Sequence, residues 1–147
     1  MVVINNKITG DKGELDVIKR VACPNCNRKL MLLPNSYPLY DVQCRGCFFR
    51  AQVKSTNGSK PHDIIRGAGW DIIHKVLKAG ALVPPLIVNF KWKENGKPKQ
   101  EIRFYPFIKK ASLMNYVANI KSRQRKYKMF NYNLREMKYY VLPSAEK

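Results

Sequence analysis

Near the N-terminus, the segment DKGELDVIKRVA has apolar residues on one side of a helical repeat. Leu15, Ile18 and Ala22 recur at helical spacing, with Val21 beside them. Such a 3.6-residue period is typical of a helix that packs one face on a core. The pattern therefore predicts a helix from about Lys12 to Arg20.

Shorter apolar runs, bounded by turn residues, follow this helix and predict strands. The connection PNSYP separates the first two runs, and ENGKP supplies a hairpin signal between two later ones. Pro106 places the end of the penultimate run at an edge or a bulge. The predicted strands are 29–33, 39–44, 48–56, 86–93, 100–108 and a short final strand or extended tail at 139–142.

Two further segments have helical spacing. In Ile64–Ala79 the apolar stripe is Ile65, Ala68, Ile72, Val76 and Ala79. Two glycines there indicate that the regular helix starts near Gly69. The second segment, Ala111–Ser122, has its apolar residues at the positions Leu113, Tyr116, Val117 and Ile120. Both segments are predicted to be helices.

The mixture of helices and strands predicts an α/β (α+β) fold. At 147 residues with 45% hydrophobic content, the chain can bury one core. We therefore expect a single domain over residues 1–147.

The cysteines change this picture, because all four occur as two Cys-x-x-Cys pairs. Cys23 and Cys26 are separated by 17 residues from Cys44 and Cys47. This spacing is typical of a zinc ion held by four thiolates, which leaves no open coordination position. The sequence thus predicts a structural zinc site within residues 23–47.

The charge of the chain points to a polyanionic partner. A formal net charge of +18 and a pI near 10.0 favour nucleic acid, whose phosphates release counterions when neutralised. An anionic membrane surface is the alternative. No apolar run approaches the roughly 20 residues needed to cross a bilayer, and no signal peptide is visible. We therefore expect an intracellular, cytoplasmic protein, and the sequence leaves a homodimer open.

Basic and aromatic residues are interleaved over the stretch 121–138. Basic groups beside aromatic rings suit phosphates and bases, although the same rings could simply pack on the core. The residues predicted to contact nucleic acid are Lys121, Arg123, Arg125, Lys126 and Lys128.

A family resemblance enters at the two strands around the second cysteine pair. Asp41, followed after ten residues by Gln52, Val53 and Lys54, resembles the signature of the PD-(D/E)xK, restriction-endonuclease-like nucleases. Gln in the acidic position is similar to their Mrr-like branch. The interleaving of CxxC, Asp, CxxC and QxK looks most like the catalytic domain of zinc-containing type II restriction endonucleases that cut adenine-methylated GATC.

The resemblance implies both a fold and a chemistry. The fold is a restriction-endonuclease-like mixed sheet flanked by helices, with an inserted four-cysteine zinc ribbon, in the order helix, three strands, helix, strand. The function is that of a Mg²⁺-dependent DNA endonuclease, a hydrolase of phosphodiester bonds. Asp41, Gln52 and Glu14 would be Mg²⁺ ligands, and Lys54 would orient water or stabilise charge on the phosphate.

Two other functions are compatible with the residues. In the first, the chain is a noncatalytic zinc-ribbon protein that binds nucleic acid, and Gln52 and Lys54 are only residues of a strand face. In the second, the basic surface binds an acidic protein. Glu14, taken alone, is also typical of a solvated acid in the first turn of a helix.

Overall fold

The computed structural model describes residues 12–34, 37, 39–120 and 125–144. Within 118–120 and 125–127 it describes the backbone alone. These residues form two compact units. Unit 1 comprises Met1–Pro61, Pro84–Pro106 and Lys138–Lys147, and unit 2 comprises His62–Val83 and Phe107–Met137. The expectation of one domain stays a prediction.

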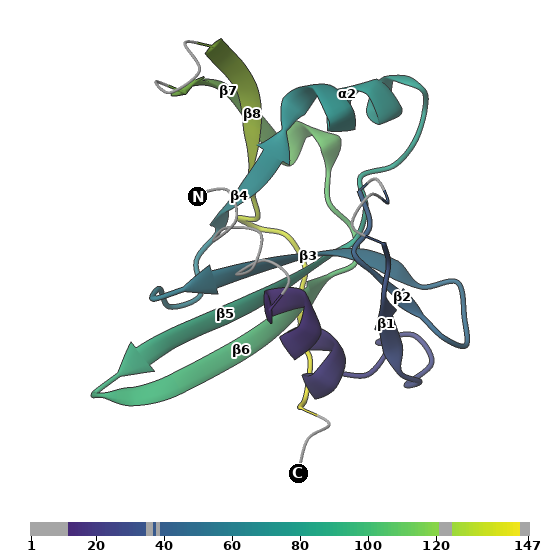
Figure 1. The fold of residues 1–147 in the computed structure, drawn as a ribbon, viewed down its shortest axis with the longest axis vertical. Coiled ribbons are helices and arrows are strands. Elements are labelled where there is room, and N and C mark those ends of the chain that lie inside the picture. Colours follow the sequence, from purple (N-terminus) through teal and green to yellow (C-terminus); the bar gives the residue numbers. More distant parts are fainter. Residues whose placement is uncertain (1–11, 35–36, 38, 121–124, 145–147) are drawn as a thin grey trace. The chain divides into compact units, whose positions relative to one another are not determined.

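Unit 1 is built on a six-stranded mixed sheet in the order β1-β2-β3-β5-β6-β9 (Figure 1). Its strands are β1 (Leu30–Leu32), β2 (Val42–Cys44), β3 (Arg50–Asn57), β5 (Leu86–Glu94), β6 (Lys97–Tyr105) and β9 (Tyr140–Val141). Neighbouring strands are antiparallel except β3 and β5, which are parallel. A parallel pair needs a long connection, and here residues 58–85 provide it.

The hairpin of β5 and β6 turns at Asn95 and Gly96, as the Asn-Gly signal predicted. Both residues have positive φ, 51° and 75°, as a type I′ turn requires. The strand β6 begins three residues earlier than predicted and ends before Pro106.

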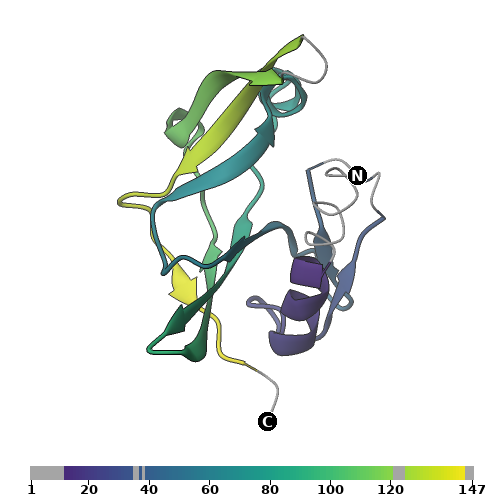
Figure 2. The same cartoon turned by 60° about the vertical axis from the view of Figure 1, so that its left-hand side comes forward.

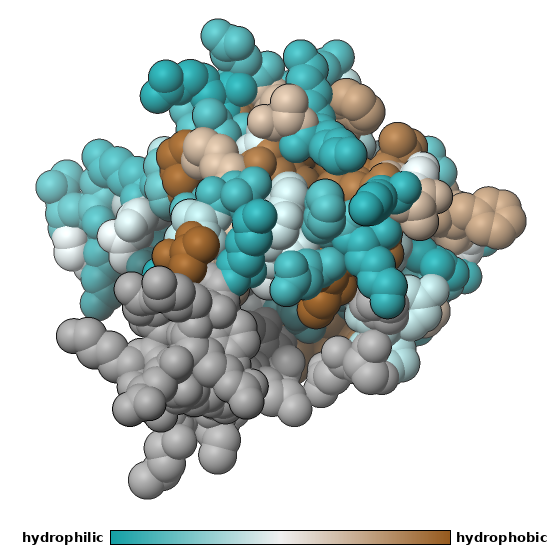
Figure 3. Space-filling view, turned by 90° about the horizontal axis from the view of Figure 1, so that it is seen from above, coloured by the Kyte–Doolittle hydropathy of each residue, from teal (hydrophilic) through white to brown (hydrophobic). Residues whose placement is uncertain are grey.

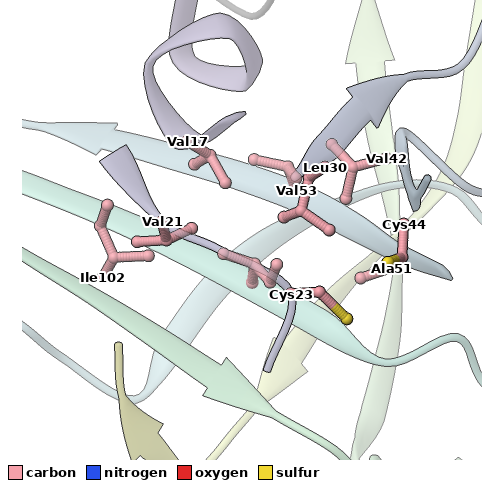
Figure 4. Packing of buried hydrophobic residues seen from close by; sticks show 10 residues of the cluster. Val17, Val21, Cys23, Leu30, Val42, Cys44, Ala51, Val53 and Ile102 are labelled. Carbon is pink, nitrogen blue, oxygen red and sulfur yellow. The ribbon is translucent and has the colours of Figure 1, made fainter. Parts of the chain in front are cut away.

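Residues 12–20 form a helix that covers the sheet of unit 1, and the predicted end at Arg20 is confirmed. Val17 on this helix and Val21, directly after its last residue, are buried against Val53, Ile87 and Ile102 from three central strands (Figure 4). Leu15, which was assigned to the apolar stripe, is instead 40% exposed. Cys23 and Cys44 belong to the same core, so the cysteine pairs are anchored in it.

Unit 2 has a three-stranded antiparallel sheet in the order β4-β8-β7 (Figure 2). Its elements are β4 (Ile64–Gly69), α2 (Trp70–Lys78), a 3-10 turn (Lys110–Ser112), β7 (Leu113–Ile120) and β8 (Arg125–Asn133). Ile65, Ile73, Phe130 and Tyr132 are almost fully buried and form its core.

Two helix predictions in unit 2 need correction. Residues 64–69 are a strand, and the helix begins at Trp70, close to the start indicated by Gly69. The predicted stripe on this helix is also wrong, since Ile72 is 61% exposed while Ile73 is buried. The segment predicted as the helix Ala111–Ser122 is mainly the strand β7.

The element order of the described chain is a helix, three strands, β4, a helix and further strands, which confirms a mixed α/β fold. None of the helices in the described ranges is long and apolar enough to cross a membrane. The surface seen in Figure 3 is mainly hydrophilic, with apolar side chains scattered between polar ones.

Candidate functional sites

The four cysteines are brought together as predicted. All four Sγ atoms lie within 4.8 Å of one another, with Cys23 and Cys47 at 3.6 Å and Cys26 and Cys44 at 3.3 Å. In a tetrahedral zinc site with Zn–S bonds of about 2.3 Å, sulfurs are about 3.8 Å apart. All four are free thiols, so the cluster could hold a metal such as zinc.

Each cysteine pair forms a tight turn, here called a knuckle, whose backbone amides point at sulfur. The amide of Asn25 donates to Cys23 Sγ at 3.4 Å, and that of Gly46 donates to Cys44 Sγ at 3.3 Å. Asn27 closes the first turn with a φ of 66°, which asparagine tolerates better than most residues. Such N–H donors stabilise thiolates, the form in which cysteine binds metal.

The sulfurs differ in how readily they lose protons. Burial raises the pKa of Cys23 to about 12, although amides of the first knuckle oppose this effect. Cys47 has a pKa lowered to about 6, because the Asn25 side chain and the Phe49 amide donate to its sulfur. A metal entering the cluster must therefore displace protons, which makes its affinity dependent on pH.

A second group of polar residues gathers where β2 and β3 diverge. Asp41 immediately precedes β2, and its amide donates to the carbonyl of Ala51 at 3.0 Å. Its carboxylate Oδ2 accepts the amide of Val53 at 2.8 Å, in the position where a backbone carbonyl would continue the ladder. Asp41 is thus fixed by the strand split itself rather than by a flexible loop.

Glu14 and Lys54 meet Asp41 at this split. The side chain of Glu14, from the helix 12–20, lies close enough to the Asp41 carboxyl to affect its pKa. Burial raises the pKa of Asp41, while the Val53 amide, the Lys54 charge and Glu14 oppose the rise.

Lys54 is the cation of this group. Burial lowers the pKa of its ammonium, and the negative charges of Asp41 and Glu14 oppose that effect. A desolvated ammonium beside two carboxyls interacts more strongly with an anion than an exposed lysine does. Three of the four residues predicted for catalysis are therefore close enough to perturb one another.

Gln52, the fourth of these residues, is 9% exposed and lies two residues before Lys54 on β3. Alternate residues of a strand share a face, so Gln52 and Lys54 lie on the side opposite Ala51 and Val53, which enter the helix-covered core. In the described chain, only the four cysteines form a group of three or more His, Cys, Asp or Glu side chains suited to a metal. The group at the strand split offers the carboxyls of Asp41 and Glu14 and the ammonium of Lys54.

A partly buried polar network around Asp16 was not predicted. Its carboxylate accepts Asn89 at 3.0 Å, Gln100 at 2.7 Å and Lys91 at 3.0 Å, and it also pairs with Arg20 at 2.8 Å. Burial opposes ionisation of Asp16, but these donors outweigh it and hold its pKa well below the ordinary value. The network ties the helix 12–20 to β5 and β6, which gives it a structural role.

The basic residues predicted to contact nucleic acid belong to unit 2. Lys121 and Arg123 lie outside the described residues, and Arg125 and Lys126 begin β8. Lys128 is exposed, with its ammonium 5.8 Å from the centre of the Trp70 ring. Their role in binding stays a prediction.

Comparison with protein-family models and with curated proteins found no match for this chain.

Proposed function

We propose that this chain is a metal-dependent DNA endonuclease that hydrolyses phosphodiester bonds. Its site would comprise Asp41, Glu14, Gln52 and Lys54, and a structural zinc ion would be held by the four cysteines. The observation that carries the proposal is the convergence of two carboxyl groups, those of Asp41 and Glu14, beside the partly buried Lys54. Two neighbouring carboxylates repel each other in a fold, whereas a divalent cation is bound by both.

The donor set fits Mg²⁺, which prefers hard oxygen ligands. Asp41 and Glu14 would hold it through carboxylate oxygens, and Gln52 could add a neutral amide oxygen. When bound, Mg²⁺ neutralises phosphate charge and lowers the pKa of a coordinated water. Since Asp41 would bind the metal as a carboxylate, metal binding should strengthen as the pH rises through the raised pKa of Asp41.

The chain's own residues would position the phosphate. The Val53 amide fixes the orientation of the Asp41 carboxylate, so this side chain loses little conformational entropy when metal and phosphate bind. The Lys54 ammonium can donate to a phosphate oxygen and stabilise the charge that grows there during hydrolysis. Its partial burial makes this interaction stronger than it would be in water.

The arrangement of unit 1 supports the resemblance to restriction-endonuclease-like nucleases. An antiparallel β1-β2-β3 meander, a helix 12–20 that packs on it and a strand β5 parallel to β3 follow the expected order. The cysteine cluster joins the helix to the β2-β3 hairpin, so a zinc ribbon would brace the strands that carry Asp41, Gln52 and Lys54. Four thiolates leave no position for substrate, which gives zinc a structural role.

A noncatalytic zinc-ribbon protein that binds nucleic acid is the second candidate. It is favoured by one observation: the cysteine cluster is complete, whereas the proposed Mg²⁺ site has only two carboxyls. In that case the site around Asp41 would stabilise the strand split and do nothing more.

The test compares Asp41→Asn and Lys54→Met with the wild type on plasmid and single-stranded DNA, with Mg²⁺ or Mn²⁺. Asp41→Asn keeps an oxygen to accept the Val53 amide and removes only the charge, so the fold should persist. Both variants should lose at least about 100-fold in cleavage rate while DNA binding and zinc content remain. Asp71→Asn, an exposed acid on α2, is the matched control and should cleave normally.

Cleavage that survives in both variants would exclude this site as the catalytic one. A wild-type protein that binds DNA with zinc in place, yet cuts none of these substrates, would leave the binding protein as the function.

A further inference from the structure

Phe48, in the second knuckle, is completely exposed. Its relative accessibility is 101%, whereas the adjacent Phe49 packs edge-on against Phe104 with ring centroids 5.4 Å apart. Of two consecutive phenylalanines, one therefore belongs to the core and the other projects into solvent. A single exposed apolar residue is common on protein surfaces, so Phe48 is informative only together with its surroundings.

The backbone on both sides of Phe48 is held in place. Cys47 Sγ accepts the Phe49 amide at 3.4 Å and the Asn25 side-chain amide at 3.5 Å. The amide of Cys44 donates to the carbonyl of Phe49 at 2.9 Å. A ring presented from such a fixed turn loses little entropy when it contacts a ligand.

A pocket of about 430 Å³ opens beside the ring. It has mainly apolar walls together with one amide side chain, and its lining residues are Pro24, Asn25, Cys47, Phe48, Phe49, Phe104 and Pro106. This volume lies within the range of ligand-sized clefts and admits one flat aromatic group next to Phe48.

The surroundings of Phe48 are cationic. The side chain of Arg28 lies across Gly46, where an added Cβ would be only 2.2 Å from Arg28 Cδ. Arg45 is exposed in the same knuckle, and Arg50 is held by Gln43 at 2.9 Å and by the Tyr37 hydroxyl at 2.7 Å. From residue 23 to residue 62 the only acidic side chain is Asp41, which is engaged inside the fold.

An isolated ring among arginines fits a nucleobase better than it fits a protein. A stable protein interface needs roughly 1,000 Å² of buried surface with an apolar centre, which one ring does not supply. Stacking on an aromatic side chain, with phosphates on nearby cations, is how single strands are held. Paired bases inside a duplex do not expose their faces, so the base must be unpaired.

We propose that the second knuckle binds an unpaired base of single-stranded DNA, stacked on Phe48, with neighbouring phosphates at Arg28, Arg45 and Arg50. This inference rests on the proposed function in that it names a single-stranded segment as part of that enzyme's substrate. The binding step itself requires no cleavage, so it can be tested separately.

The experiment measures binding of a labelled single strand and of its duplex by fluorescence anisotropy, without Mg²⁺, over a range of salt concentrations. Phe48→Ala should weaken single-strand binding about 5- to 150-fold, the effect of losing one base stack. Duplex affinity should stay within about twofold. The slope of log affinity against log salt should not change, because stacking releases no counterions. Arg45→Gln should instead reduce that slope by about 0.7.

Two further variants make the result specific. Phe48→Trp should retain affinity, and its indole fluorescence should be quenched by the bound base. Phe107→Ala removes another exposed phenylalanine, 62% accessible and located in unit 2, and should leave binding unchanged.

Single-strand affinity that is unchanged in Phe48→Ala would overturn the proposal, as would an equal loss on duplex and single strand. A loss of cleavage in Asp41→Asn leaves this inference intact if binding still depends on Phe48. If cleavage persists and single-strand binding does not depend on Phe48, the inference is rejected and the proposed nuclease function is retained.

Discussion

Asp41 has a structural contact and a proposed role in binding metal. Its carboxylate accepts the Val53 amide at the edge of the β2-β3 pairing, and Glu14 and Lys54 lie close enough to affect its pKa. Removal of the whole side chain, as in Asp41→Ala, would leave a buried amide without an acceptor, at a cost of about 1–3 kcal/mol. Asp41→Asn separates the two roles and is the more informative variant.

Without metal, Asp41 should make the protein less stable as the pH rises. Burial raises its folded-state pKa above the ordinary 3.8, so its contribution to stability is complete below that value and disappears as the pH passes the raised pKa. At neutral pH, Asp41→Asn should therefore be at least as stable as the wild type. Chemical denaturation between pH 4 and about pH 8 measures this difference.

Added Mg²⁺ should make the wild type more stable than Asp41→Asn, because a ligand bound only by the folded state stabilises that state. The wild type should gain stability with Mg²⁺ concentration, and Asp41→Asn should gain much less. An equal gain in both proteins would place any Mg²⁺ elsewhere.

At the scale of the site, local spacing predicted the cysteine cluster, and the four cysteines meet as expected. Asp41, Glu14 and Lys54, which were assigned from the family resemblance, lie close enough to affect one another, and their catalytic role stays a prediction. The Asp16 network could not be foreseen, because it joins Asp16 to Asn89 and Gln100, 73 and 84 residues away in sequence. Such a contact depends on strand pairing that no local pattern encodes.

Among the elements, β7 shows why apolar spacing failed. Leu113, Tyr116 and Val117 follow helical spacing, yet in the strand Leu113 is 6% exposed while Val117 is 59% exposed. In the described structure β7 is an edge strand that pairs with β8 alone, so apolar and polar residues need not alternate strictly along it. Short apolar runs of this kind do not distinguish a helix from a strand.

Gly67 should be essential for the sheet of unit 2. A Cβ at this position would lie 2.4 Å from the Phe130 ring and 2.6 Å from the Phe130 carbonyl oxygen, which belongs to the neighbouring strand. The ring can turn away, but the carbonyl is fixed by the sheet. We expect Gly67→Ala to lower the free energy of unfolding by about 2–3 kcal/mol, as measured by urea denaturation.

Gly69→Ala is the matched control, since its Cβ would meet nothing within 4 Å. Its effect should stay below about 1 kcal/mol. Equal destabilisation by the two variants would mean that glycine matters here for backbone freedom and not for close approach.

The cysteine knuckles should behave as one folding element. Cys23 and Cys44 contribute both sulfur to the cluster and surface to the core of unit 1. If the cluster holds zinc, its binding energy is also folding energy. Cys44→Ser should therefore lose the metal, detected by elemental analysis, and lower the melting temperature of the protein. A fully folded, metal-free Cys44→Ser protein would contradict this.

For the whole molecule, the net charge of +18 should dominate binding to DNA. Each phosphate neutralised on a duplex steepens the fall of log affinity with log salt by about 0.9. Replacing Arg125, Lys126 and Lys128 by glutamine should flatten that slope by about 2 to 3 if this stretch contacts DNA. An unchanged slope in a salt titration would assign the contact to other basic residues.

The two units are interleaved along the chain. Unit 1 is assembled from three segments and unit 2 from two, so the polypeptide passes from one unit to the other and back before either is complete. A single proteolytic cut can therefore never release either unit as one continuous fragment. Trimming the chain from its ends cannot isolate them either, because removal of Lys138–Lys147 takes β9 from unit 1. Engineering unit 1 alone requires internal deletions closed by new linkers, from Pro61 to Pro84 and from Pro106 to Lys138.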